Sequence, residues 1–354
     1  MTIRNNNFSL VRLFGALLVV YGHSYALTGN PPPGFAGTSV STIGVKIFFS
    51  ISGYLVSRSW LSDPSVVRFF SRRALRIFPA LVCVVLTTVF IIGPSLTRLP
   101  LSEYFSNSET YRYIDNIFLY IIYYLPGLFQ ANTYPNAVNG SLWSLPAEFL
   151  MYIITPMILV GVTVARRGRV ISLALLLVAI ALLAGQTEQS TRPWVVYATN
   201  VWAVVSLAPY FIVGLAVAAA RLERLFNIYV SFALLFILAV FQTNAVIEET
   251  MLIFILPYVT LSFASGQNLA PKLGDLDVSY GVFLWGFLIQ QVLAHFIPGL
   301  TPWQMFAMAF PLSLIPAFYS WNIVEKPALR AKPAPRAKFP DSVKAVGGIA
   351  NVAR

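Results

Sequence analysis

The sequence contains repeated runs of apolar residues, each about as long as a bilayer-crossing helix. Such a helix needs roughly 20 mostly apolar residues, and only helices or closed barrels satisfy every backbone hydrogen bond within lipid. By this measure we predict about ten spans, at residues 8–27, 41–57, 77–94, 143–164, 170–185, 195–219, 226–243, 249–266, 278–297 and 303–322. The expected fold class is therefore all-α, a polytopic membrane bundle of about ten transmembrane helices.

Composition supports this assignment and excludes several other classes of protein. Charged residues make up 10% of the chain, against about 25% in soluble domains, so a cytosolic globular protein and a disordered protein are excluded. Cys83 is the single cysteine, so no internal disulfide can form and we predict no metal site. The formal net charge is +11, but the basic residues form separate clusters rather than one continuous face, which excludes a nucleic-acid partner.

The basic clusters lie in alternate connections between the predicted spans. They follow the second, fourth, sixth and last spans, whereas the connections 28–40, 186–194, 244–248 and 298–302 are nearly free of positive charge. Short cytoplasmic loops carry an excess of Lys and Arg. Both termini are therefore expected in the cytoplasm, with membrane lipids around the bundle.

One segment affects the count of spans. The segment 116–130 is apolar but short and contains Pro126 and Gly127, so we interpret it as an interfacial or re-entrant part of a long outer segment, 95–142. Loops of such length are usually functional. We divide the chain into a transmembrane domain, residues 1–328, and a basic, Pro-rich cytoplasmic tail, residues 329–354, that we expect to be disordered.

Ionisable residues inside the predicted spans mark candidate functional sites, because charge is costly in the hydrocarbon. Arg12 and His23 are 11 residues apart, so they share one helical face and are separated by about 16 Å along the axis. Glu148 is predicted at nearly the depth of His23, with Tyr152 one turn later. A carboxylate beside an imidazole can fix its tautomer, which suits a general base. Snorkelling of Arg12, a packing hydrogen bond of His23 and an interfacial Glu148 remain as structural alternatives.

A second candidate site lies at the opposite membrane face. Arg72, Arg73 and Arg76 precede the third predicted span, and arginine forks match phosphate oxygens; positive-inside topology and anionic lipid would explain them equally. Ser52 lies in a small-residue pair that allows close helix approach. Lys46 is expected near the outer surface, paired with an acid or facing water. Together the two sites predict a long phosphorylated cofactor that passes through the bundle.

The motifs resemble those of the membrane acyltransferase-3 family, in order and spacing, over about residues 6–328. They are the first span with Arg12 and His23, then 47–55 (IFFSISGYL), 72–79 (RRALRIFP), 141–148 (SLWSLPAE) with Tyr152, 279–285 (SYGVFLW) and 324–327 (VEKP). Two departures stand out: Lys46 replaces an acid found in many members, and Gly286 replaces a histidine.

The resemblance implies an integral membrane O-acyltransferase that moves an acyl group, most often acetyl from acetyl-CoA, to a hydroxyl of an exported carbohydrate. Such acceptors include O-antigen of lipopolysaccharide, exopolysaccharide and Nod factor, and the expected location is the bacterial cytoplasmic (inner) membrane. It implies that His23 is catalytic with Arg12 and Glu148, and that Arg73 and Arg76, with Arg72 and Ser52, hold CoA. Tyr152, Trp143 and Lys46 are supporting or substrate-contacting candidates. Direct transfer and an acyl-His23 intermediate both remain open.

Two other functions fit the same residues. A transporter or flippase of an anionic lipid-linked substrate would need the charges but no thioester. A non-catalytic subunit of a polysaccharide-synthesis complex would use Arg12 and His23 only for structure.

Overall fold

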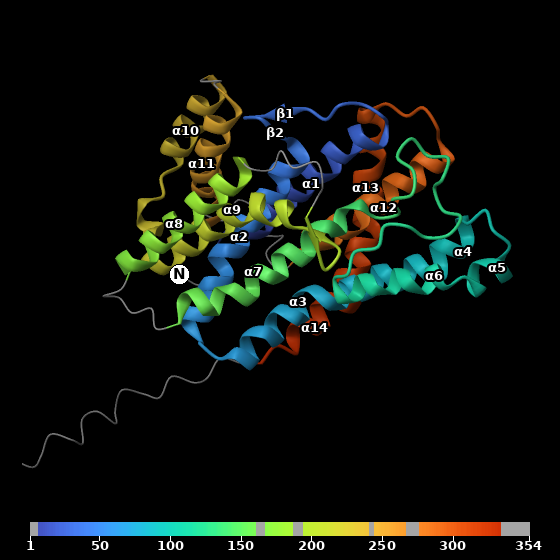
Figure 1. Cartoon of the computed structure of the whole chain (residues 1–354), viewed down its shortest axis with the longest axis horizontal. Helices are drawn as coiled ribbons and strands as arrows, with labels where there is room; N and C mark the ends of the chain where they lie inside the picture. Colours follow the sequence, from blue (N-terminus) through green and yellow to red (C-terminus); the bar gives the residue numbers. More distant parts are fainter. Residues whose placement is uncertain (1–5, 161–166, 187–193, 241–243, 267–275, 334–354) are drawn as a thin grey trace, which may run out of the picture.

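The computed structural model describes residues 6–160, 167–186, 194–240, 244–266 and 276–333, and these residues are mostly helical (Figure 1). The long helices are α1 (Phe8–Leu27), α2 (Val40–Ser62), α3 (Val66–Thr87), α7 (Ser144–Leu159), α8 (Arg167–Gln186), α9 (Val201–Ala220), α10 (Ile228–Val240), α11 (Ala245–Ser265), α12 (Ser279–Phe296) and α13 (Pro302–Ser320). Each overlaps one of the predicted spans. The all-α prediction is therefore confirmed for the described residues.

The number of helices suited to crossing a membrane is smaller than the number predicted. Among the described residues, seven helical segments are long and apolar enough: the α1, α2, α7, α9, α11 and α13 regions and the segment 66–96 that contains α3. The helix α10 is shorter, and α12 carries Gln290, Gln291 and His295, which lower its mean hydropathy. The chain is a membrane protein with at least these seven candidate spans.

Helices α1 and α2 run antiparallel at the centre of the bundle. Their close approach depends on small residues, because a Cβ atom on Gly44 would lie only 2.4 Å from the carbonyl oxygen of Gly15. On its other side α2 packs closely against α9, where a Cβ on Gly53 would lie 2.0 Å from the Phe211 carbonyl oxygen. These contacts fix the depth of every site residue on α1 and α2.

The remaining helices surround this centre on several sides. Helix α9 also packs against α8, and α10 against α11, while α12 packs against α1 and α13. In Figure 1 the α8–α11 group lies on one side of α1 and α2, and the α12–α13 pair lies on the other. Two short hairpins, β1 (Gly34–Phe35) with β2 (Thr38–Ser39) and β3 (Val195–Val196) with β4 (Thr199–Asn200), precede α2 and α9.

Helix α3 begins earlier than the third predicted span. Predicted to start at Ile77, it starts at Val66 and continues through Pro79. The basic residues Arg72, Arg73 and Arg76 therefore lie on a helix rather than in a connection. The helix extends because α2 ends at Ser62, and Asp63 then holds the first turns of α3 through Arg68 and Arg72.

The long segment after α3 contains only short helices. These are the π-helical turn η1 (Thr88–Ile92), α4 (Gly93–Leu96), α5 (Leu101–Ser106), α6 (Ser108–Arg112), the 3-10 helix η2 (Tyr113–Phe118) and the 3-10 helix η3 (Gly140–Trp143). Between Leu119 and Asn139 the backbone is irregular, so the apolar segment 116–130 forms no spanning helix. Hydrogen bonds such as Asn132 to Gln291 and Asn139 to Leu284 attach it to α12.

The helix continues without a break beyond α13 and passes alongside α3. The π-helical turn η7 (Trp321–Glu325) leads into α14 (Lys326–Arg330), and both pack against α3 (Figure 1). A 3-10 turn, η5 (Leu222–Leu225), follows α9 near the same end of α2. The predicted tail lies largely outside the described residues, which stop at Pro333.

Candidate functional site

His23 lies near the end of α1, beside the beginning of α2. A Cβ on its neighbour Gly22 would lie 2.7 Å from the Ser41 side chain, which places this part of α1 at the first turn of α2. The imidazole ring contacts Phe287 of α12 edge to face, with ring centroids 5.1 Å apart. Its Nδ1 is buried and has no hydrogen-bond partner among the described residues. We call this region the His23 end of the bundle.

Glu148 is held by two hydroxyl groups. Its Oε1 accepts hydrogen bonds from Ser52 of α2 at 2.7 Å and from Tyr152 of α7 at 2.5 Å. The predicted pairing of Glu148 with Tyr152 on one helical face is therefore present. The predicted contact between Glu148 and His23 is not formed.

The separation of Glu148 from His23 follows from depth in the bundle. His23 lies level with Ser41, whereas Glu148 is bonded to Ser52, 11 residues farther along α2. At 1.5 Å per residue this corresponds to about 16 Å. The expected common depth was wrong because Trp143 and Ser144 begin α7 inside the bundle rather than at its surface, so Glu148 lies near the depth of Arg12.

Arg12 and Arg76 share one carboxylate at the opposite end of the bundle. Asp277 accepts from Arg12 Nη1 at 3.0 Å and from Arg76 Nη2 at 2.7 Å, and the Ser279 hydroxyl donates to its other oxygen. Arg76 also lies 3.9 Å from Glu325. Burial disfavours the charged form of Asp277, but the two guanidinium groups outweigh burial and hold its pKa at about 2.

Arg72 and Arg73 have different surroundings although they are neighbours in sequence. Arg72 is bonded to Asp63 at 2.5 Å and to the Pro333 carbonyl oxygen at 3.3 Å. Arg73 makes no ion pair within the described residues, and its Nε is buried without a hydrogen-bond partner. Its guanidinium lies 5.9 Å from the centroid of the Tyr152 ring. We call the region around Arg12, Arg73 and Arg76 the Arg73 end.

Lys46 forms a buried ion pair rather than facing water. Its Nζ donates to both carboxylate oxygens of Glu249 at 2.8 Å and to Thr38 at 3.2 Å. The Tyr210 hydroxyl donates to the same carboxylate. The pair joins α2 to α9 and α11, which assigns Lys46 to packing, away from both ends of the candidate site.

A cavity lies between the two ends. It is lined by Val45, Phe48, Phe49, Ser144, Leu145, Glu148, Tyr280 and Phe283. The rings of Phe48 and Phe283 meet edge to face with centroids 5.8 Å apart. A Cβ on Gly15 would lie 3.5 Å from the Phe48 ring, so this ring pair lies between the depths of Arg12 and His23.

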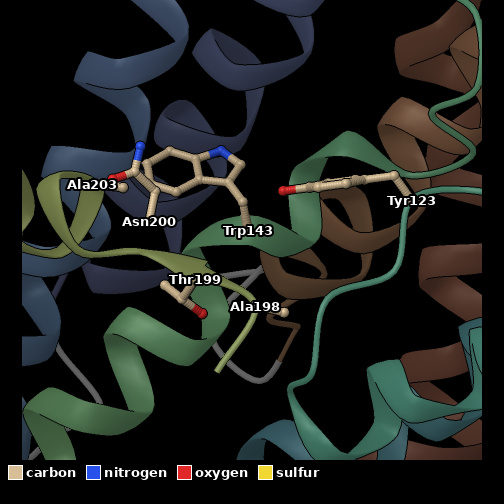
Figure 2. A pocket seen from close by; sticks show the side chains of 6 residues that line it. All are labelled: Tyr123, Trp143, Ala198, Thr199, Asn200 and Ala203. Atoms are coloured by element: carbon tan, nitrogen blue, oxygen red, sulfur yellow. The ribbon is translucent and has the colours of Figure 1, made fainter. Parts of the chain in front are cut away.

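A second pocket, of about 300 Å³, opens beside the start of α9. It is lined by Tyr123, Trp143, Ala198, Thr199, Asn200 and Ala203. Figure 2 shows the indole of Trp143 with Asn200 on one side and the hydroxyl end of Tyr123 on the other. Trp143, a predicted supporting residue, therefore lies in a pocket separate from Glu148.

The sequence prediction missed Asp277, which links Arg12 to Arg76. The signal was available, because Asp277 stands two residues before the motif that begins at Ser279. It was passed over because it lies just outside the predicted ninth span. Phe287, the ring that contacts His23, carried no polar signal and could not be selected from sequence.

Comparisons with known proteins identify the family of this chain. The family model described as an acyltransferase domain, acyltransferase-3, matches residues 5–321. The chain therefore belongs to the acyltransferase-3 family, and it is a membrane-bound acyltransferase.

Two curated relatives cover nearly the whole chain. One, named O-acetyl transferase and found in Shigella phage Sf6, is 33% identical over 333 residues, 91% of this chain and 96% of the relative. The other, Nodulation protein 10 of Rhizobium leguminosarum bv. viciae, is 28% identical over 356 residues, 92% of this chain and 94% of the relative. No solved structure gives a significant match.

Proposed function

We propose that this acyltransferase moves an acetyl group from acetyl-CoA, bound at the Arg73 end, to a hydroxyl of an exported carbohydrate at the His23 end. The observation that carries the proposal is Arg73, a half-buried side chain whose Nε is buried without a hydrogen-bond partner and which forms no ion pair within the described residues. The O-acetyl transferase relative supports the same group transfer.

The residues at the Arg73 end fit an anionic donor. CoA carries three phosphate groups, and guanidinium forks bind phosphate oxygens in bidentate geometry. Arg12 and Arg76 already share the Asp277 carboxylate, whereas Arg73 forms no ion pair among the described residues, so Arg73 is the group that gains most from a phosphate. Tyr152 supports the Arg73 guanidinium through its ring face, and Glu148 fixes the Tyr152 hydroxyl.

His23 supplies acid–base chemistry at the other end. Acetyl-CoA supplies an activated acyl carbon whose bond to sulfur breaks as the bond to the acceptor oxygen forms. His23 would take the proton from the acceptor hydroxyl and return it to the departing thiolate, so that no net proton is consumed. Since Glu148 does not touch the imidazole, we assign Glu148 to positioning Tyr152 and Ser52 at the donor side.

The same proposal orients the chain in the membrane. Acyl-CoA is a cytoplasmic metabolite, so the Arg73 end faces the cytoplasm and the His23 end faces outward. Both termini are then cytoplasmic, in agreement with the positive charge of the connections at the Arg73 end. In a bacterium this places the protein in the inner membrane.

Complementation of a deletion strain tests the proposal. Surface glycans from cells that carry wild-type protein, His23→Ala or His295→Ala would be analysed by mass spectrometry for O-acetyl groups. We expect the wild type to restore acetylation, and His23→Ala to reduce it at least about 100-fold because the proton acceptor is lost.

The control uses the other histidine. His295 lies near the end of α12 against Phe129 and Phe296, so its replacement should leave acetylation intact. Immunoblots of membranes would establish equal amounts of each variant. Glycan acetylation that persists in His23→Ala would overturn the assignment, and glycans without acetyl groups in every strain would overturn the proposed acceptor.

A further inference from the structure

The pocket at Trp143 is built for a polar ligand with apolar faces. Its walls combine two aromatic side chains, Trp143 and Tyr123, with the polar side chains of Thr199 and Asn200. Tyr123 is 39% exposed, so its ring is accessible from outside. Ligand sites usually join an aromatic or apolar lining to a few fixed polar groups, and a sugar ring presents C–H faces and hydroxyl edges that match such a lining.

The polar groups of the pocket have unused hydrogen-bonding capacity. Asn200 Oδ1 accepts from the Trp202 backbone N–H as the cap of α9, which leaves the amide NH₂ as a donor. Thr199 donates to the Tyr197 carbonyl oxygen, which leaves its lone pairs as acceptors. Among the described residues, the Trp143 indole N–H and the Tyr123 hydroxyl have no hydrogen-bond partner. Several donors beside one acceptor suit a group of neighbouring hydroxyls.

The β3–β4 hairpin, which forms one wall of the pocket, contains two residues in an unfavourable backbone conformation. Tyr197 and Ala198 have φ angles of 51° and 54°, a conformation that is unfavourable by about 1 kcal/mol or more for residues other than glycine. The Tyr197 hydroxyl donates to the Phe118 carbonyl oxygen, and its ring contacts Tyr120 with centroids 5.3 Å apart. These contacts attach the hairpin to the segment after η2 and fix Thr199 and Asn200 opposite Trp143.

One short helix, η3, connects the pocket to the aromatic ring that contacts His23. A Cβ on Gly140, the first residue of η3, would lie 2.6 Å from the Phe287 ring that contacts His23. Trp143 is the last residue of η3, about 6 Å from Gly140 at the rise of a 3-10 helix. The path from the imidazole to the pocket therefore includes 5.1 Å between the His23 and Phe287 rings and about 6 Å along η3, which is more than the length of one sugar unit.

We infer that this pocket is a subsite for a further sugar unit of the acceptor, beyond the unit that is acylated. The inference rests on the proposed function and goes beyond it, because it predicts that the enzyme prefers acceptors of at least two sugar units. Trp143 stacks on the ring, while Asn200 and Thr199 bond its hydroxyls.

The test measures acetyl transfer to acceptors of graded length. Purified protein in detergent or lipid vesicles would receive acetyl-CoA and oligosaccharides of one to five units, prepared from the source cell's own surface polysaccharide after removal of O-acyl groups with base. For the wild type we expect kcat/KM to rise about 10-fold or more between the one-unit probe and the probes long enough to reach the pocket. Trp143→Ala should abolish this rise, so that its kcat/KM no longer depends on the length of the acceptor.

Conservative variants separate recognition from folding. Trp143→Phe retains a ring and should keep most of the length dependence. Asn200→Asp keeps the oxygen that caps α9 but loses the NH₂ donor, so it should lower kcat/KM for the longer probes without lowering thermal stability. Trp303→Ala is the matched control, because Trp303 is 63% exposed and packs against Tyr21, away from the pocket.

The outcomes distinguish failure of the proposed function from failure of the subsite. Absence of transfer from acetyl-CoA to every probe by the wild type would reject the proposed function. Transfer that is independent of acceptor length, or a length dependence that survives in both Trp143→Ala and Asn200→Asp, would reject the subsite alone. If a lipid headgroup occupied the pocket instead of a sugar, transfer would be independent of acceptor length and the subsite would be rejected.

Discussion

Arg72 and Arg73 are adjacent in sequence, but their guanidinium groups have different tasks. Arg72 is neutralised by Asp63 and bonded to the Pro333 carbonyl oxygen, so its charge serves the connection between α2, α3 and the end of the described chain. Arg73 has a buried Nε without a partner, forms no ion pair within the described residues, and lies near the faces of the Phe69 and Tyr152 rings. Replacement of Arg72 should therefore change the stability of the protein, whereas replacement of Arg73 should change binding of the donor.

Replacing Arg73 should weaken donor binding. Loss of a charge-assisted hydrogen bond costs about 1.5–3 kcal/mol, so Arg73→Ala should raise the KM for acetyl-CoA roughly 10- to 100-fold, and Arg73→Lys should have an intermediate effect. Arg72→Ala should lower the melting temperature in detergent and change the KM less than threefold. Equal increases in KM for the two alanine variants would contradict the distinction.

Asp277 should give the Arg73 end a measurable pH dependence. Its pKa, about 2, lies below the ordinary value of 3.8. Its ionisation therefore stabilises the fold above pH 4, and this contribution is lost as the pH falls through 2. Asp277→Asn should lower stability at pH 7 by roughly 2–3 kcal/mol, and the difference from wild type should shrink in acid. A melting-temperature difference that grows between pH 4 and pH 2 would contradict this assignment.

At this scale the sequence indicated which ionisable residues to examine, but not their partners. Arg12 and His23 stood out because an ionisable group within an apolar run is costly. The predicted partnership of His23 with Glu148 depended on the depth at which α7 begins, and that depth is set by contacts between distant segments. The hydroxyls of Ser52 and Tyr152 take the place that an imidazole was expected to occupy.

The central helices are held together by contacts that leave no room for a side chain. A Cβ on Gly53 would lie 2.0 Å from the Phe211 carbonyl oxygen, whereas a Cβ on Gly168 would have no atom within 4 Å. Gly53→Ala should therefore lower the free energy of unfolding by about 1–3 kcal/mol through overpacking. Gly168→Ala is the matched control and should have little effect or raise stability. Thermal unfolding followed by size-exclusion chromatography would measure both.

Elements were easier to predict than their ends. Every predicted span contains a long helix, because continuous apolar sequence leaves few other structures in lipid. The start of α3 was predicted too late because a cluster of arginines is typical of a connection between spans. In the structure Asp63 and Asp277 pair with these arginines, so the arginines lie on the helix. The hairpin β3–β4 forms a wall of the pocket at Trp143. Its turn could not be recognised from sequence, because Tyr197 and Ala198 occupy positions that usually favour glycine or asparagine.

For the whole molecule, the proposed orientation predicts which ends of the bundle are accessible from each side of the membrane. In a Cys83→Ser background, Asn30→Cys would report the His23 end and Arg224→Cys the Arg73 end, because both positions are exposed. A membrane-impermeant maleimide should label Asn30→Cys in intact spheroplasts and Arg224→Cys only after permeabilisation, since the basic connections face the cytoplasm. The reverse pattern would invert the proposed topology.

The edge-to-face contact of Phe48 with Phe283 has a consequence for the cell that houses this enzyme. A bundle that admits a thioester from one compartment and a hydroxyl from the other is in danger of becoming a leak for protons and ions. Under the proposed function, the two aromatic rings lie between these entrances and offer no hydration to a charge. An apolar ring pair at this depth would therefore limit the leakage of ions while the proposed transfer proceeds.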